Sequence, residues 1–160
     1  MKEIFFGRPS DTVERQQHQP HFETAREVHE FLLDRTGTAL MSGDFDMFAS
    51  CFALPQEIHT FDGSRLIKAP EDLRKIFNDV RAHFKSHNVT ELVRTIMDAE
   101  FRDPDTVATT HVSRPLNGSL ITQDPYPVFS ILKRVNGVWK VAHSEYAIRN
   151  EHALTKALTG

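Results

Sequence analysis

The chain has 160 residues, 39% of them hydrophobic, and its 22 acidic and 19 basic residues give a formal net charge of −3. This size predicts one domain whose core needs no disulfide or metal ion, and the charge excludes the positive field that draws proteins to nucleic acid or anionic membranes. No run approaches the roughly 18 apolar residues of a membrane span and no secretory signal begins the chain, so we expect a cytoplasmic protein without a membrane partner.

The N-terminal quarter predicts an arm followed by two helices. Residues 1–20 are mostly polar and are expected to form a flexible arm ahead of a single domain over residues 21–160. Apolar residues recur near helical spacing from 22 to 42, and Gly43 predicts the end of this first helix. Asp44 is the expected N-cap of a short second helix.

A hairpin and a third helix follow. Asp62-Gly63-Ser64 predicts a turn between two short strands. Pro70 suits the first position of a helix, and the two acidic residues after it would lie beside the positive end of the helix dipole. This third helix is expected to run to about His87.

After the third helix the pattern changes to alternating and β-branched residues, which predicts strands. Asn136-Gly137 is the strongest hairpin signal in the chain, because both residues tolerate positive φ. We therefore expect an α+β fold, with an antiparallel sheet that curves around the N-terminal helices. The strands are expected at 89–101, 106–113, 128–135 and 138–148, before a short terminal helix at 151–158.

Several short motifs occur in a distinctive order between residues 24 and 149. They are Ser42-Gly43-Asp44-Phe45-Asp46, Phe52-Ala53-Leu54-Pro55, Ala69-Pro70-Glu71-Asp72-Leu73, His87-Asn88-Val89-Thr90, Asp105-Thr106-Val107-Ala108, and the run from Asn136 to His143. This order resembles the nuclear-transport-factor-2-like superfamily, which includes SnoaL-like polyketide cyclases, ketosteroid isomerase and scytalone dehydratase. The resemblance implies a cone-shaped, cystatin-like α+β barrel, a pocket between sheet and helices, and a homodimer packed sheet against sheet.

The reactions of these relatives do not transfer residue by residue. The Tyr-Asp pair of scytalone dehydratase would fall at Leu40 and Met41, which lack its chemistry, although His87 matches its histidine at the start of the sheet. The base of ketosteroid isomerase would fall near Thr60, and its oxyanion-holding tyrosine near Thr36. The resemblance thus implies the pocket but neither known reaction.

Three residues are candidate catalytic groups. Alternate residues of a strand share a face, so His87 and Glu91 are expected to project together, and His111 to project into the cone from the next strand. Imidazole titrates near pH 6.5, so His87 with Glu91 or His111 is a suitable pair for proton transfer. The alternative is that His87 is a cation exposed at the C-terminal end of the third helix.

Three further residues are candidate ligand-binding groups: Tyr126, His143 and His59. Tyr126 lies between two prolines in an expected loop, where its hydroxyl would overhang the cone mouth or its ring would simply pack. For His143 a structural role, hydrogen-bonded between sheet and helix, is favoured over catalysis. Either face of its strand remains open as the pocket side, and Trp139 on that strand is expected in the core.

Neither a metal nor a cofactor is expected. Asp79, His83 and His87 recur every four residues, but three ligands so spaced span about 12 Å of helix axis and do not converge on one ion. Cys51 lies in an apolar run and is expected to be a small buried hydrophobe. No phosphate-binding glycine loop and no nucleophile elbow occurs in the sequence.

Two functions from different classes remain. The first is a cofactor-free protein that binds a small apolar organic ligand, with isomerase, dehydratase or cyclase-like proton transfer. The second is a non-catalytic ligand-binding or dimerisation module. The enzyme requires that His87, Glu91 and His111 converge in a pocket, whereas the module predicts a cone filled by apolar side chains and an apolar patch on the surface.

Overall fold

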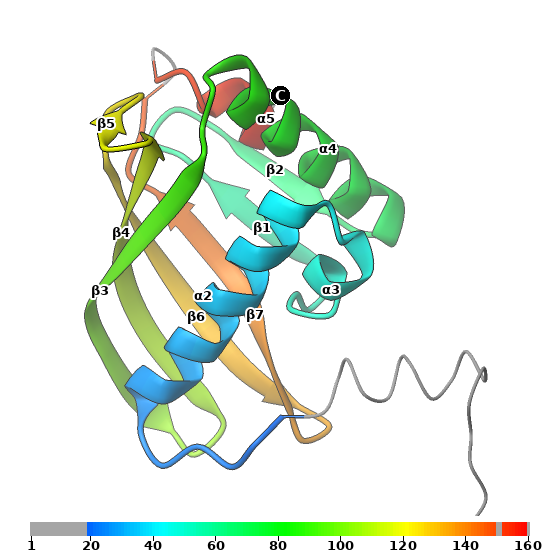
Figure 1. Cartoon of the computed structure of the whole chain (residues 1–160). Helices are drawn as coiled ribbons and strands as arrows, with labels where there is room; N and C mark the ends of the chain where they lie inside the picture. Colours follow the sequence, from blue (N-terminus) through cyan, green and yellow to red (C-terminus); the bar gives the residue numbers. More distant parts are fainter. Residues whose placement is uncertain (1–18, 150–151, 160) are drawn as a thin grey trace, which may run out of the picture.

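The structure is a computed structural model that describes residues 19–149 and 152–159. Most of the expected N-terminal arm therefore lies outside the described residues. Figure 1 shows the elements, which are α2 (Ala25–Ser42), α3 (Phe45–Ala49), β1 (Gln56–His59), β2 (Ser64–Ile67), α4 (Pro70–Ser86), β3 (Glu91–Asp103), β4 (Thr106–Asn117), β5 (Leu120–Ile121), β6 (Tyr126–Val135), β7 (Val138–Tyr146) and α5 (Thr155–Thr159).

The predicted helix boundaries follow from local hydrogen bonds. At the start of α2, the Glu27 N–H donates to the Thr24 hydroxyl (3.1 Å) and the Thr24 N–H donates to the Glu27 carboxylate (3.0 Å). Gly43 ends this helix in the left-handed region at φ 85°. The Asp44 carboxylate accepts from the Met47 N–H and begins α3, as the sequence predicted.

The strands of the described chain form one curved, unclosed seven-stranded sheet in the order β2-β1-β7-β6-β4-β3, with β5 paired to β4. The α+β prediction is confirmed, but the sheet is mixed, because β1 lies parallel to β7. The reason is local: after α3 the chain already runs beside Val141, whose N–H and C=O bond to Cys51 and Ala53. The first strand of the hairpin, β1, therefore runs in the same direction as β7.

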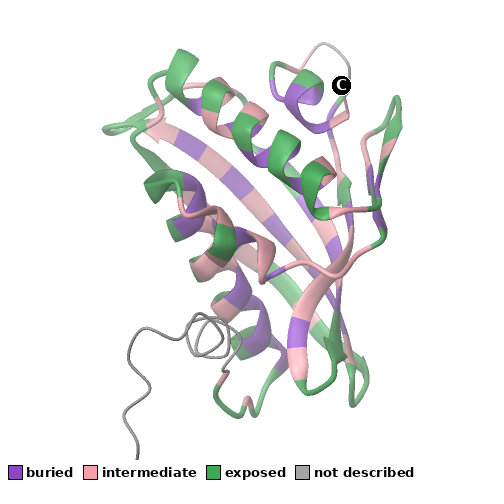
Figure 2. Ribbon diagram, turned by 90° about the vertical axis from the view of Figure 1, so that its right-hand side faces the viewer, coloured by how far each residue is buried: buried purple, intermediate pink, exposed green. Residues whose placement is uncertain are grey.

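The helices cover one face of this sheet. In Figure 1, α2 crosses the concave face, while α4 and α5 lie over the end where β1 and β2 are. Figure 2 shows that buried and more exposed residues alternate along the long strands, as expected for a sheet with one covered face. Trp139 and Cys51 are both buried, as predicted.

A β-bulge on β7 determines which of its residues face the helices. Leu132 pairs with Val141 and Ile131 with His143, so Ala142 is an extra residue. One extra residue reverses the alternation of side chains along a strand. The inward residues are therefore Trp139 and Val141 before the bulge, and Ser144 and Tyr146 after it.

Candidate functional site

An interior cavity of about 90 Å³ lies between the covered face of the sheet and the helices. Its walls are mainly apolar, and they include side chains from α2, α4, α5 and the strands. The polar groups among its lining residues are His29, Thr36, Arg94, His111, Ser113, Tyr126, Ser130, Ser144 and Tyr146. No aspartate or glutamate is among the described residues that line it.

Strand register places several of these polar residues in adjacent rows. Arg94 on β3 pairs with Ser113 on β4, which in turn pairs with Tyr126 on β6. His111 lies two residues before Ser113 on β4 and therefore projects from the same face, about 7 Å along the strand. The rings of Tyr126 and Tyr146 are 6.0 Å apart. The cationic, imidazole and phenol groups thus share one region of the inner sheet.

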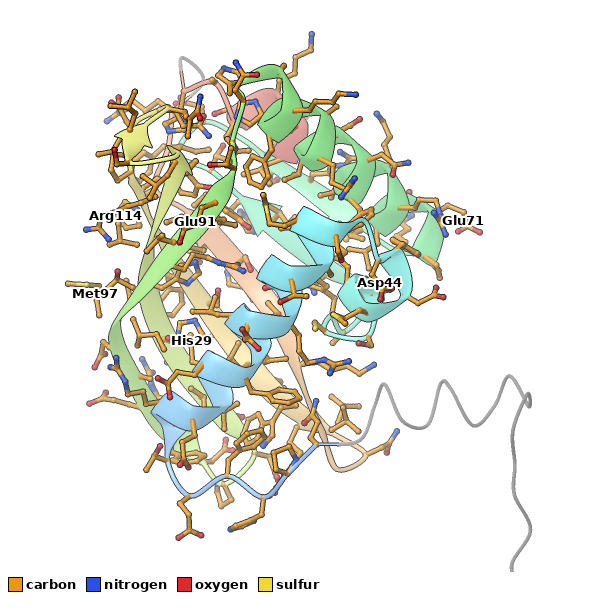
Figure 3. The ribbon with its side chains drawn as sticks, in the orientation of Figure 1. His29, Asp44, Glu71, Glu91, Met97 and Arg114 are labelled. Carbon is orange, nitrogen blue, oxygen red and sulfur yellow. The ribbon has the colours of Figure 1, made fainter. Side chains whose placement is uncertain are left out.

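His29 on α2 is held in one tautomer by a chain of hydrogen bonds. The Thr109 hydroxyl donates to the Asp98 carbonyl (2.8 Å), so its oxygen is left to accept from Nδ1–H of His29. Nε2 of His29 is then the unprotonated nitrogen. Figure 3 shows His29 between α2 and the sheet, and its ring lies 5.2 Å from that of His111.

Both interior imidazoles are neutral at neutral pH. Burial, reinforced by the charge of Arg94, lowers the pKa of His29 to about 4 and the pKa of His111 to about 3. Nδ1 of His111 is buried without a hydrogen-bond partner in the described part of the chain. Each ring therefore offers an uncharged imidazole to whatever occupies the cavity.

Arg94 is the charged residue of the cavity wall, and it is partly buried. One of its guanidinium nitrogens, Nη2, donates to the Leu33 carbonyl on α2 at 2.7 Å. A Cβ at Gly37 would lie only 2.7 Å from the same nitrogen, so the guanidinium rests directly against the helix backbone. Burial lowers the pKa of this guanidinium from its ordinary value, but an arginine remains protonated at neutral pH.

The two tyrosines complete the polar region. Burial raises the pKa of both Tyr126 and Tyr146, whereas the nearby charge of Arg94 opposes this shift. Both phenols are therefore neutral hydrogen-bonding groups rather than phenolates.

Solved structures share this arrangement of sheet and helices. A nuclear-transport-factor-2-like protein with a cystatin-like fold from Novosphingobium aromaticivorans gives a TM-score of 0.60 at 16% identity, over 85% of this chain and 89% of that one. A protein of unknown function with a cystatin-like fold from Nostoc punctiforme gives 0.58 at 17% identity, over 81% and 94% of the two chains. This chain has the nuclear-transport-factor-2-like fold.

A ketosteroid isomerase-like protein from Erwinia carotovora atroseptica also shares the fold, with a TM-score of 0.57 at 13% identity over 79% of this chain and 97% of that one. No protein-family model and no curated protein matches the sequence. At such low identities the likeness establishes the nuclear-transport-factor-2-like fold and leaves the chemistry to the residues of this chain.

The structure does not bring the three candidate catalytic residues together. His111 is buried and lines the cavity. Glu91 is exposed, and the next residue, Leu92, faces inward. The strand partner of His111 is Ile96, five residues after Glu91, so Glu91 and His111 are separated by about 16 Å along the strands. The convergence expected from the sequence is therefore absent.

His87 also lies away from the cavity. It caps the C-terminal end of α4, where its Nδ1 is 3.0 Å from both the His83 carbonyl and the Ser86 hydroxyl. This position matches the alternative that the sequence left open for His87, a place at the helix C-terminus.

The candidate ligand-binding residues are divided between the two faces of the sheet. Tyr126 begins β6 rather than standing in a loop, and its buried ring lines the cavity. His143 and His59 lie on the outer face, with ring centroids 5.2 Å apart, and pair with Glu145 (2.7 Å) and Glu57 (3.3 Å). The bulge at Ala142 turns His143 outward, so it cannot bridge sheet and helix.

Residues 19–149 and 152–159 contain no cluster of three or more histidine, cysteine or acidic side chains that could hold a metal ion. Asp79 pairs instead with Lys75 (2.9 Å), and His83 Nε2 lies 2.9 Å from the Gln123 side-chain oxygen. Within the same ranges no helix has the length and apolar character needed to cross a membrane.

Two polar residues of the cavity wall, His29 and Arg94, were not predicted as site residues from the sequence. His29 follows Val28 within the apolar stripe of the first helix, so a polar residue at a core position was the available signal. Arg94 lies between Val93 and Thr95, and the bulge at Met97 removes the clear alternation that would have placed it inward. Its signal in the sequence was weak.

Proposed function

We propose that the protein binds a small organic molecule in the interior cavity of its nuclear-transport-factor-2-like fold. The observation that carries this proposal is the combination of apolar walls with polar groups gathered on one part of the sheet, including a buried His111 nitrogen that lacks a partner. Pockets of this composition are typical of small-molecule sites, and the polar groups fix the orientation of the ligand.

The size of the cavity limits the size of the ligand. Its volume of about 90 Å³ is smaller than an apolar cavity of about 150 Å³ that holds one benzene ring. The cavity as it stands therefore admits a short branched chain, and a body the size of a benzene ring enters only when the surrounding side chains or helices move apart. The apolar organic ligand expected from the sequence is compatible with these walls.

His29 supports a second candidate function, cofactor-free proton transfer of the isomerase or dehydratase class. Thr109 fixes the tautomer of this ring, so that Nε2 has a free lone pair beside His111. A positioned neutral imidazole can accept a proton from a bound substrate and return it to another atom. In this proposal His29 and His111 take the place that the sequence assigned to His87, Glu91 and His111.

The expected homodimer and cytoplasmic location remain predictions. Apolar side chains are exposed at one side of the sheet, with Met97 62%, Leu120 71% and Ile121 57% exposed. Figure 3 shows Met97 pointing away from the molecule. These residues suit the alternative of a module that associates through its surface.

A fragment screen with a cavity-filling variant tests the binding proposal. Ser144 lines the cavity, whereas Thr110 on β4 faces outward, so Ser144→Leu and Thr110→Leu add the same side chain on opposite faces. A neutral single-ring fragment at 100 times its dissociation constant adds about 2.7 kcal/mol of stability. We expect melting temperatures of the wild type and Thr110→Leu to rise by roughly 5–10 °C.

Ser144→Leu is expected to show little or no rise, because the added side chain occupies the space of the fragment. The proposal would be contradicted if no fragment stabilised the wild type. An equal response of Ser144→Leu would also contradict it, since the fragments would then bind outside the cavity.

A further inference from the structure

We propose that the ligand carries a carboxylate and that Arg94 binds it. This inference rests on the proposed function, because it assigns a chemical class to the occupant of the same cavity. It comes from four features of Arg94, which are its missing counter-charge, its free donors, its neighbours and its place in the cavity wall.

Arg94 has no acidic partner. The ion pairs within residues 19–149 and 152–159 include none with this guanidinium, and no acidic residue of those ranges lines the cavity. Glu30, Asp34 and Glu91 line the surface cleft on the other side of Arg94. The charge of Asp34 acts on the guanidinium from that side, but no described ion pair joins the two. On the cavity side this cation is shielded from water without an acidic partner, and an anionic ligand there offsets the desolvation cost.

Most of the hydrogen-bonding capacity of Arg94 remains open. A guanidinium has five N–H donors, and the described bond to the Leu33 carbonyl uses one. None of its nitrogens is among the buried atoms that lack a partner, and the residue as a whole is partly exposed. The planar fork of a guanidinium matches the two oxygens of a carboxylate.

Within the cavity, the neighbours of Arg94 favour an anion over a cation. Ser113 and Tyr126 stand in the same cross-strand row and offer hydroxyl donors. The two interior histidines and the two tyrosines are neutral at neutral pH, because burial lowers the pKa of the imidazoles and raises the pKa of the phenols. The cavity wall therefore carries one positive charge, and hydroxyl donors lie next to it.

The position of Arg94 also indicates how the ligand lies. Leu33, Leu92 and Arg94 line both the interior cavity and a surface cleft between α2 and β3. This trio separates the cavity from the cleft. A carboxylate at Arg94 would lie at that wall, while the apolar body extends inward toward residues such as Leu32 and Val128. The ligand class is thus a small apolar monocarboxylic acid with one ring or a short branched chain.

A pair of probes of equal shape tests the inference. Benzoate and benzamide have the same ring and differ mainly in charge, and calorimetric titration at neutral pH gives the affinity of each. The proteins are the wild type, Arg94→Met, Arg94→Gln and the control Arg114→Met. Figure 3 shows Arg114 pointing away from the molecule, and its side chain bonds to Thr95 on the outer face.

We expect the wild type and Arg114→Met to bind benzoate at least about tenfold more tightly than benzamide, because a charge-assisted bidentate pair is lost with the amide. Both Arg94 variants should bind the two probes about equally and keep their affinity for benzamide. Two substitutions of different polarity are used so that poor folding of one leaves the other to decide.

Three results would overturn the inference. If benzamide binds the wild type as tightly as benzoate, the carboxylate assignment fails and the cavity remains a site for neutral molecules. If both Arg94 variants keep the preference for benzoate, another residue holds the charge. If neither probe binds the wild type and no fragment does, the proposed function fails together with the inference.

Discussion

At the residue scale, burial sets the protonation of the two interior histidines, and one nearby charge adds to its effect. Arg94 acts on both His29 and His111, and adds to burial in keeping these rings neutral. Because the rings lie in the interior, their protonation is coupled to the stability of the fold. This coupling gives a measurable dependence of stability on pH.

Stability should fall as the pH is lowered through the range in which the unfolded chain gains protons and the folded chain does not. Both histidines have an ordinary pKa of 6.5, against about 4 for His29 and about 3 for His111 in the folded state. Their contribution is complete above about pH 6.5 and decreases by roughly 1.4 kcal/mol per pH unit for each ring down to about pH 4.

Urea unfolding between about pH 7 and pH 4.5 measures this slope. His111→Gln should reduce it by about one histidine's share, and His29→Gln should do the same. The same substitution at the exposed His21 is the control. A slope unaffected by both interior substitutions would show that the two imidazoles titrate in the folded protein as they do in the unfolded chain.

Part of the site could be predicted at this scale. His111 could be placed in the cavity wall because β4 is a regular strand next to a recognisable turn. Tyr126 was expected in a loop at the cone mouth, because the prolines on either side of it obscure the start of β6. Glu91 was misplaced because the alternation of β3 gives two opposite assignments. His29 was overlooked, because a histidine within an apolar helix stripe has the same spacing as its apolar neighbours.

At the scale of elements, Gly37 shows how α2 accommodates the arginine. A glycine inside a helix usually destabilises it by about 1 kcal/mol relative to alanine. Here a Cβ would lie 2.7 Å from Nη2 of Arg94, so the missing side chain provides the place where the guanidinium meets the Leu33 carbonyl. The glycine lowers the intrinsic stability of α2, and in return it makes room for the contact between Arg94 and the Leu33 carbonyl.

Gly37→Ala should therefore behave differently in two backgrounds. In the wild type the guanidinium must move, so we expect no gain in the free energy of unfolding and weaker binding of benzoate. In Arg94→Met the helix gains about 1 kcal/mol, because nothing opposes the methyl group. Chemical denaturation of the four proteins measures the coupling, and additive effects would contradict this account of Gly37.

The elements themselves were largely predictable, whereas their irregularities were not. Capping residues and Asn136-Gly137 gave the helices and the last hairpin from local chemistry. The bulges at Met97 and Ala142 depend on how neighbouring strands pair, which no local pattern records. These bulges determine which side chains of β3 and β7 face inward, and therefore which of them line the cavity.

At the scale of the whole molecule, the curved sheet and its covering helices leave a cavity that belongs to no single element. The order of motifs was enough to predict the nuclear-transport-factor-2-like fold. The volume of the cavity was not predictable from the sequence. It is the small difference between the volume that the backbone encloses and the summed volumes of many side chains.

The most direct test of the central claim locates a bound probe by methyl NMR. Val128 and Val135 belong to the same strand, but Val128 is 2% exposed and lines the cavity, whereas Val135 is 42% exposed. We predict that saturation with benzoate shifts the methyl resonances of Val128, Leu32 and Leu132 and leaves those of Val135 and Leu120 unchanged. Shifts confined to Val135, Leu120 and other exposed methyl groups would show that the interior cavity is not the binding site.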